Sequence, residues 1–209
     1  MRTKNPRGSN EIYLTRHAKA EHNIKEGFFA GGRTDTRLSD TGKKEVVELA
    51  RQIAKLGNSI KTIFCSQLVR SRETAEIIAR EIRRNGFPAK IIEISGLNEV
   101  NVGEFTGKSG EAVKRLYPKE AASFYEGNIS NWNFPKGENF EKLCKRAKTV
   151  FAYIKKTVRP HEGAIIVGHA MFNRTLLYLL YPKRKNLWQP IIYPHNTLIP
   201  IKEKLFKQK

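Results

Sequence analysis

Apolar positions along the chain follow two patterns, short runs typical of strands and longer amphipathic stretches typical of helices. The short apolar runs predict strands at residues 12–15, 60–64, 89–94, 163–168 and 197–201. Stretches with apolar residues three and four positions apart predict helices at residues 39–57, 71–84, 139–158 and 172–181. The run at 163–168 is apolar almost throughout, as expected of a central strand buried on both faces.

This alternation predicts an α/β fold, a three-layer sandwich with a mostly parallel central sheet and helices on both faces. Residues 100–136 interrupt the pattern with Gly, Pro and aromatic residues, and we expect a helical lid insertion there. We expect a single domain over residues 11–203, between basic flexible tails at residues 1–10 and 204–209. A chain of 209 residues can bury a core without disulfides or metal ions.

The charge of the chain narrows the classes of partner. Lys and Arg total 39 against 20 for Asp and Glu, which gives a formal net charge of +19. Such an excess favours a polyanion, an anionic surface or a small anionic substrate. No segment approaches the roughly 20 apolar residues of a membrane span, and no apolar signal run precedes Glu11, so no membrane contact is expected.

The scarcity of Asp and Cys excludes several kinds of chemistry. Only Asp35 and Asp40 are aspartates, so there is no Asp pair for a divalent metal, and phosphate-binding loops of the Gly-x-x-x-x-Gly-Lys type are also missing. Cys65 and Cys144 are too few for a disulfide framework or a zinc site. We therefore expect no metal, no cofactor and a reducing, cytoplasmic location.

Side chains suited to phosphate chemistry follow four of the predicted strands. Arg16 and His17 follow the first strand, Arg70 the second, Glu99 the third and His169 the fourth. Ligands of open parallel sheets bind at the carboxyl ends of the strands, so we expect these five side chains in one crevice. The other histidines are expected to be surface residues or local hydrogen bonders: His22, His161 and His195.

The motifs around these residues resemble those of the histidine phosphatase superfamily, the phosphoglycerate-mutase-like proteins. The matching segments stand in the family's order: Thr15-Arg16-His17-Ala18 with Asn23, Gly32 to Leu38, Cys65-Ser66 to Ala75, Leu97-Asn98-Glu99, Gly137-Glu138 with Arg146, and Gly168-His169-Ala170. The resemblance extends from about residue 11 to 201 and implies the α/β fold predicted above.

The resemblance also implies roles for the five residues. His17 would be the nucleophile that forms a phosphohistidine, and Glu99 the general acid and base. Arg16, Arg70 and His169 would bind the transferring phosphoryl group, with His169 as an imidazolium. Four further residues would complete the substrate-binding set: Asn23, Gly31, Gly32 and Ala170.

Three departures from the family pattern lie next to the two site histidines. Ala18 and Ala170 replace glycines but are small, and Lys19 stands where an acidic residue is usual. We hypothesise that Lys19 either keeps His17 neutral and attracts anions or points into solvent.

We expect a metal-independent phosphomonoester hydrolase that acts on a small phosphorylated metabolite, because Glu99 is followed by Val100-Asn101-Val102 and not by the mutase sequence Arg-His-Tyr-Gly. The partner would be this substrate or inorganic phosphate, and the protein a monomer or homodimer. Phosphoglycerate-mutase-type phosphotransfer is one alternative. A basic scaffold that binds nucleic acid or another anionic partner is the other, although the basic runs are not interleaved with aromatics as stacking platforms require.

Overall fold

The computed structural model describes residues 11–24, 28–56, 59–126, 129–188 and 194–201. The predicted tails at 1–10 and 204–209, and the predicted domain end at 203, lie outside the described residues. No helix in the described ranges is long and apolar enough to cross a membrane.

Five strands form one sheet in the order β3-β2-β4-β1-β5. Their bounds are Glu11–Arg16 for β1, Ile60–Cys65 for β2, Lys90–Glu93 for β3, Gly163–Gly168 for β4 and Ile199–Ile201 for β5. The pairs β1–β4, β2–β4 and β2–β3 are parallel, whereas β5 runs antiparallel to β1. The prediction of a mostly parallel sheet is therefore confirmed.

The helices agree closely with the periodicity of the sequence. Their bounds are Asp40–Ala54 for α1, Val69–Arg84 for α2, Gly110–Leu116 for α3, Pro118–Tyr125 for α4, Phe140–Thr157 for α5 and Ala170–Leu180 for α6. Helices α1 and α5 begin after capping residues: Ser39 accepts from the Gly42 N–H, and Asn139 accepts from the Lys142 N–H. Helices α2 and α6 each begin two residues earlier than predicted.

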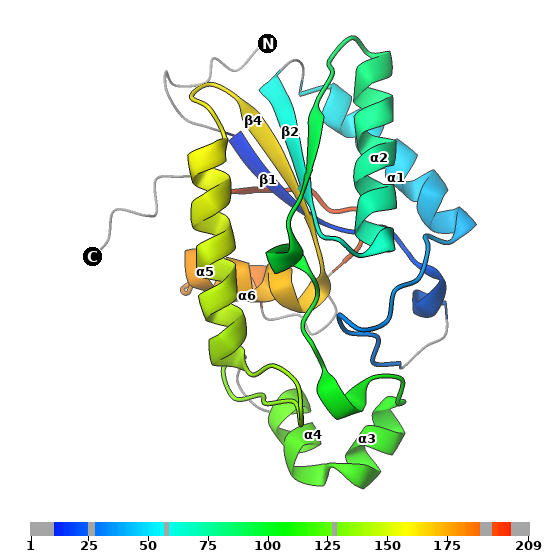
Figure 1. Cartoon of the computed structure of the whole chain (residues 1–209), viewed down its shortest axis with the longest axis vertical. Coiled ribbons are helices and arrows are strands. Elements are labelled where there is room, and N and C mark those ends of the chain that lie inside the picture. Colours follow the sequence, from blue (N-terminus) through cyan, green and yellow to red (C-terminus); the bar gives the residue numbers. More distant parts are fainter. Residues whose placement is uncertain (1–10, 25–27, 57–58, 127–128, 189–193, 202–209) are drawn as a thin grey trace.

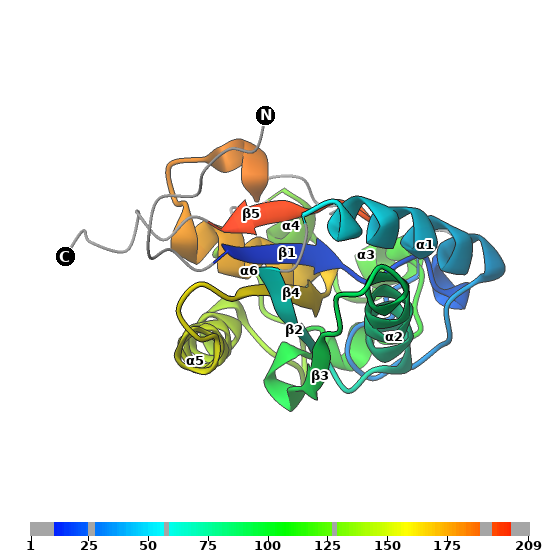
Figure 2. The same ribbon diagram turned by 90° about the horizontal axis from the view of Figure 1, so that it is seen from above.

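Strand β4 shows how helices cover both faces of the sheet. Its residues Ile165 and Val167 belong to an apolar cluster with α1 and α2, whereas Ala164 and Ile166 belong to a cluster with α5 and α6. Successive side chains of a strand point to opposite faces, so each helix pair covers its own face (Figure 2). This arrangement explains why the strand is apolar almost throughout.

Helices α3 and α4 lie beyond the carboxyl ends of β1, β2 and β4 (Figure 1). The predicted insertion at 100–136 is thus helical, and its aromatic rings pack against one another. The buried ring of Phe105 has its centroid 5.2 Å from that of Phe29, 5.4 Å from Tyr117 and 5.3 Å from Phe134. These rings therefore form a local core.

Candidate active site

The carboxyl edge of the sheet gathers the five predicted residues from separate elements. Arg16 ends β1 and His17 follows it, while Arg70 lies in the first turn of α2. Glu99 follows β3 and a short 3-10 turn at Ser95–Leu97, and His169 lies between β4 and α6. The ring centroids of His17 and His169 are 5.0 Å apart, which places the ends of neighbouring strands β1 and β4 in one site.

The ring of His17 is held in one tautomer. Its Nδ1 lies 2.7 Å from the Ala18 carbonyl oxygen, and because a carbonyl only accepts, Nδ1 must donate. The main-chain N–H of His17 donates to Gly168 at 3.0 Å, and that of Ala18 donates to the Thr74 hydroxyl at 3.0 Å. In the neutral ring, Nε2 therefore carries the lone pair that a nucleophile needs.

Burial lowers the pKa of His17 well below 6.5, and electrostatic interactions with His169, Arg70 and Arg16 lower it further. His17 is therefore neutral at neutral pH. Lys19 lowers the pKa of a different residue, His195, and its effect there is smaller than the effects of burial and of Arg16. The structure thus assigns the neutrality of His17 to burial and to its site neighbours, and not to Lys19.

Of the two arginines of the site, Arg70 is fully buried and Arg16 is partly buried. Arg70 is 1% exposed, and its guanidinium donates to the carbonyls of Thr34 at 2.6 Å and Gly31 at 3.0 Å, with Asp35 at 3.9 Å. Burial lowers the pKa of Arg70 and lowers that of Arg16 to about 10, so both remain protonated at neutral pH. The Nε of Arg70 is buried and finds no hydrogen-bond partner among the described residues.

The carboxylate of Glu99 sits against the amino end of α6. It accepts N–H bonds from Met171 at 3.1 Å and Phe172 at 3.2 Å in the first turn of this helix, and from Val100 at 2.9 Å. The positive end of the helix dipole favours a carboxylate there. Burial lowers the pKa of Arg16 and of Arg70, whereas the negative charge of Glu99 raises both values. Glu99 therefore lies close enough to both arginines to stabilise their charges.

An ion pair between Arg146 and Glu138 holds the loop that carries Glu99. Arg146 on α5 donates two bonds to Glu138, at 3.0 and 2.9 Å, and two more to the carbonyls of Gly96 at 2.8 Å and Asn98 at 2.7 Å. Glu138 also accepts from the Asn101 N–H at 2.8 Å. The pair thus fastens both sides of the loop to α5.

His169 is bonded on one side of its ring. Its Nε2 lies 2.7 Å from the Ser66 hydroxyl, which also accepts from the Leu68 N–H at 3.3 Å. Its Nδ1 is buried and has no hydrogen-bond partner within the described part of the chain. Burial, followed by Arg70 and Arg16, lowers the pKa of His169 well below 6.5. The expectation of an imidazolium is therefore wrong for the protein alone, where His169 is neutral.

Two histidines that we expected to be surface residues or local hydrogen bonders lie beside His17. The ring centroids of His195 and His22 are 5.4 and 6.2 Å from that of His17. His195 Nδ1 lies 2.7 Å from the His17 carbonyl oxygen, and His22 Nδ1 lies 2.5 Å from the Thr36 hydroxyl. Burial is the largest cause that lowers the pKa of each to about 4. The surface interpretation holds only for the exposed His161.

We call His17, His22, His169 and His195 the histidine cluster. The sequence alone did not indicate two of its members, because neither belongs to a motif at the end of a predicted strand. His195 precedes β5, and β5 is antiparallel to β1, so its beginning lies at the carboxyl edge of the sheet. His22 lies in a 3-10 turn, Glu21–Asn23, just after His17. Its place five residues after the nucleophile was the only signal, and that nearness in the chain alone is weak.

The four residues predicted to complete substrate binding make contacts within the protein. Asn23 accepts from the Ala20 N–H at 3.0 Å, and Gly31 accepts from Arg70. A Cβ on Gly32 would lie 2.5 Å from the Glu99 carbonyl oxygen, so this glycine permits a close backbone approach. Ala170 begins α6. Their role in binding substrate remains a prediction.

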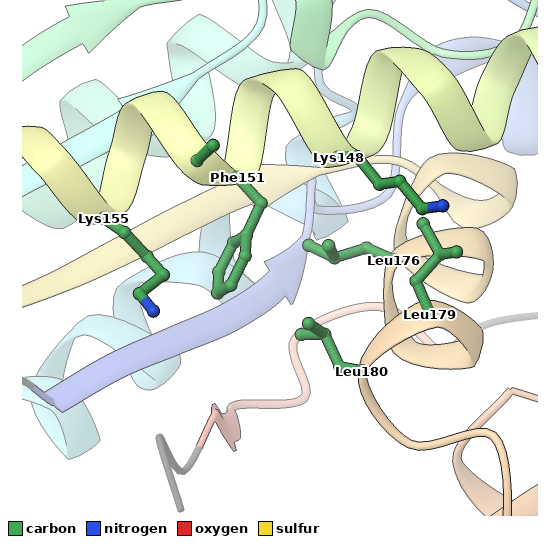
Figure 3. A pocket seen from close by; sticks show the side chains of 7 residues that line it. Lys148, Phe151, Lys155, Leu176, Leu179 and Leu180 are labelled. Carbon is green, nitrogen blue, oxygen red and sulfur yellow. The ribbon is translucent and has the colours of Figure 1, made fainter. Parts of the chain in front are cut away.

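A pocket of about 450 Å³ lies away from these residues, between α5 and α6 (Figure 3). Phe151, Leu176 and Leu180 line it, with Lys148 and Lys155 alongside. None of the predicted site residues lines this mainly apolar pocket. Among the described residues, no group of three or more His, Cys, Asp or Glu side chains is arranged to hold a metal ion.

Sequence comparison places the whole sheet and its site within one family. The family model described as histidine phosphatase superfamily (branch 1) matches residues 12–201. The human protein named 6-phosphofructo-2-kinase/fructose-2,6-bisphosphatase 1 is 27% identical over 190 residues, and its Caenorhabditis elegans counterpart is 25% identical over 190 residues. Each match covers 91% of this chain but only 36% and 38% of the relatives, so the chain spans little more than a third of their length.

Solved structures share the fold. YhfR of Bacillus stearothermophilus superposes with a TM-score of 0.76 at 23% identity, covering 92% of this chain and 90% of that one. A mycobacterial glucosyl-3-phosphoglycerate phosphatase in complex with VO3 gives 0.75 at 18% identity, with coverage of 92% and 90%. A phosphoglycerate mutase from Bacillus anthracis gives 0.75 at 17% identity, with coverage of 91% and 86%.

Proposed function

The chain belongs to the histidine phosphatase superfamily, and from this we propose that it is a metal-independent phosphomonoester hydrolase acting on a small phosphorylated metabolite. The observation that carries the proposal is the state of His17. Its Nδ1 is tied to a carbonyl and its pKa lies well below 6.5, so Nε2 is an unprotonated nucleophile at neutral pH. Arg16 and Arg70 beside it supply the positive charge that phosphoryl transfer requires.

In the first step, Nε2 of His17 attacks phosphorus, a nitrogen–phosphorus bond forms and the bond to the leaving oxygen breaks. Glu99 takes up a proton when the negatively charged substrate binds beside it, gives this proton to the leaving oxygen, and returns to the carboxylate form as the alcohol departs. In the second step, water attacks the phosphohistidine, Glu99 takes the proton of the water, and inorganic phosphate leaves. The Ala18 carbonyl, which accepts from Nδ1, stabilises the positive charge that develops on the ring.

His169 would act in this reaction as a neutral donor. The Ser66 hydroxyl accepts from the Leu68 N–H, so its own proton is available for Nε2 of His169. In that tautomer, Nδ1 carries a hydrogen that has no partner among the described residues. A buried N–H without a partner is costly, and an oxygen of the phosphoryl group would satisfy it. Arg16 and Arg70 would neutralise the charge on the same group.

The names of the relatives point to phosphorylated sugars and related metabolites, and we extend that substrate class to this chain. We further propose a cytoplasmic location, since both Cys65 and Cys144 are free thiols. We also propose that the protein is a monomer or a homodimer. Because one of the similar solved structures is a phosphoglycerate mutase, isomerisation of phosphoglycerate is the second candidate function. Release of inorganic phosphate separates the two reactions.

The test is hydrolysis of p-nitrophenyl phosphate in the presence of EDTA. We expect the wild type to be active and His17→Ala to lose roughly a thousandfold or more of its kcat, because the nucleophile is gone. His161→Ala, at an exposed histidine, is the matched control and should remain fully active. Activity that requires added metal, or that survives in His17→Ala, would refute the mechanism.

A panel of phosphorylated metabolites then defines the substrate. Release of inorganic phosphate from sugar phosphates supports the hydrolase, whereas interconversion of phosphoglycerates without phosphate release supports the mutase. A protein that hydrolyses none of them but binds RNA with a steep salt dependence would be the basic scaffold.

A further inference from the structure

We propose that His195 is a positioning residue that holds the main chain of the nucleophile His17 in place for attack. The inference rests on the proposed function, since it concerns the same nucleophile. It assigns a role to a side chain that the mechanism above does not use.

The topology brings His195 to this position. Strand β5 pairs antiparallel with β1, with Leu14 opposite Ile199. The segment before β5 therefore lies beside the residues after β1, and His195 meets His17 across the edge of the sheet. The two rings pack edge to face, with centroids 5.4 Å apart and an interplanar angle of 68°.

The hydrogen bond between them has a defined direction. His195 Nδ1 lies 2.7 Å from the His17 carbonyl oxygen, so Nδ1 must carry the proton and donate. Burial first, and the charge of Arg16 next, lower the pKa of His195 to about 4. At neutral pH the ring is therefore neutral. It adds no cation to the phosphate site, and its contribution is the bond and the ring contact.

Three elements besides β1 hold the backbone around His17. Gly168 of β4 accepts from its N–H, His195 before β5 donates to its carbonyl, and Thr74 of α2 accepts from the next N–H, that of Ala18. Since His17 is only 2% exposed, a carbonyl that loses its donor has little water to replace it. The peptide unit between His17 and Ala18 is then held by Thr74 on its N–H side alone, so it can rotate more freely.

Rotation of that peptide unit moves the nucleophile. The Ala18 carbonyl that fixes Nδ1 lies one residue further along the chain, so a change there alters the direction of Nε2. A misplacement of about 1 Å can cost on the order of a hundredfold in rate. We expect a loss of about tenfold or more in kcat. KM should change little, because Arg70, which would bind the phosphoryl group, is held by bonds to Thr34 and Gly31.

The experiment compares two amides at position 195. The Nδ2 of Asn occupies nearly the place of His Nδ1, whereas the Nε2 of Gln corresponds to the other ring nitrogen. We expect His195→Asn to keep kcat for p-nitrophenyl phosphate within about threefold of the wild type, and His195→Gln to lose about tenfold, as His195→Ala does. His161→Asn, at an exposed residue with a φ of 68°, is the control for loss of an imidazole elsewhere.

Thermal unfolding of each variant separates positioning from folding. If His195→Ala does not fold, the Asn and Gln variants decide, because they differ only in where the amide lies. Equal kcat in these two variants, or an Ala variant within twofold of the wild type, overturns the proposal. A selective loss of kcat in the Gln variant at an unchanged melting temperature supports it. Absence of hydrolysis by the wild type would instead refute the proposed function.

Discussion

Replacement of Arg146 by Met removes the ion pair that fastens the Glu99 loop to α5. Arg146 donates four hydrogen bonds, two to Glu138 and one each to the carbonyls of Gly96 and Asn98. The loss of one partner of a buried ion pair costs about 3–5 kcal/mol. The two side chains remain 23% and 19% exposed, so we reduce this to about 2–3 kcal/mol of unfolding free energy.

In a chain of this size, each kcal/mol shifts the melting temperature by roughly 2–4 °C, so Arg146→Met should melt roughly 4–12 °C lower. Differential scanning calorimetry measures this shift, and kcat for p-nitrophenyl phosphate should fall with it as the loop that bears Glu99 loosens. Arg159→Met, at an exposed arginine just after α5, is the matched control. If the two variants melt within 1 °C of each other, or if kcat in Arg146→Met is unchanged, the reasoning is wrong.

Two further predictions concern close packing and pH. Gly32→Ala would place a Cβ 2.5 Å from the Glu99 carbonyl oxygen, and because backbone must then shift, we expect a loss of about 1–3 kcal/mol in urea unfolding together with a lower kcat. The histidine cluster has folded-state pKa values below the ordinary 6.5, about 4 for two members, so the unfolded chain binds protons first as the pH falls. The unfolding free energy should therefore be fully present above pH 6.5 and decline from pH 6.5 toward 4. Urea unfolding at pH 7 and pH 5 measures this decline in the unfolding free energy. A smaller decline in His22→Asn gives the part that His22 contributes. If the wild type is equally stable at both pH values, the lowered pKa values of the histidine cluster are contradicted.

The elements of this fold could be predicted from the sequence because their signals are local. A strand buried on both faces must be apolar at consecutive positions, and a surface helix must repeat apolar residues at three and four positions. Arg16, His17, Arg70, Glu99 and His169 stood out because each lies at or after the end of a predicted strand. Parallel neighbours in one sheet share a carboxyl edge, so the site followed from the order of elements.

Other parts of the site depended on pairings that no local pattern contains. The direction of β5 decides whether the residues before it or after it reach the site, and that direction is set by its pairing with β1. The charge of His169 depends on burial and on arginines from other elements. The sequence alone therefore led to an imidazolium, which the structure does not support.

The sequence by itself determined the family, the α/β alternation and the five residues at strand ends, because covalent neighbours and periodicity carry that information. Only the tertiary structure decided that His22 and His195 stand beside the nucleophile, that Glu99 rests on the first turn of α6, and that Arg146 fastens its loop. Protonation state and side-chain direction depend on burial and on hydrogen-bond partners far apart in the chain. Those partners are known only once the strands have paired and the helices have packed against them.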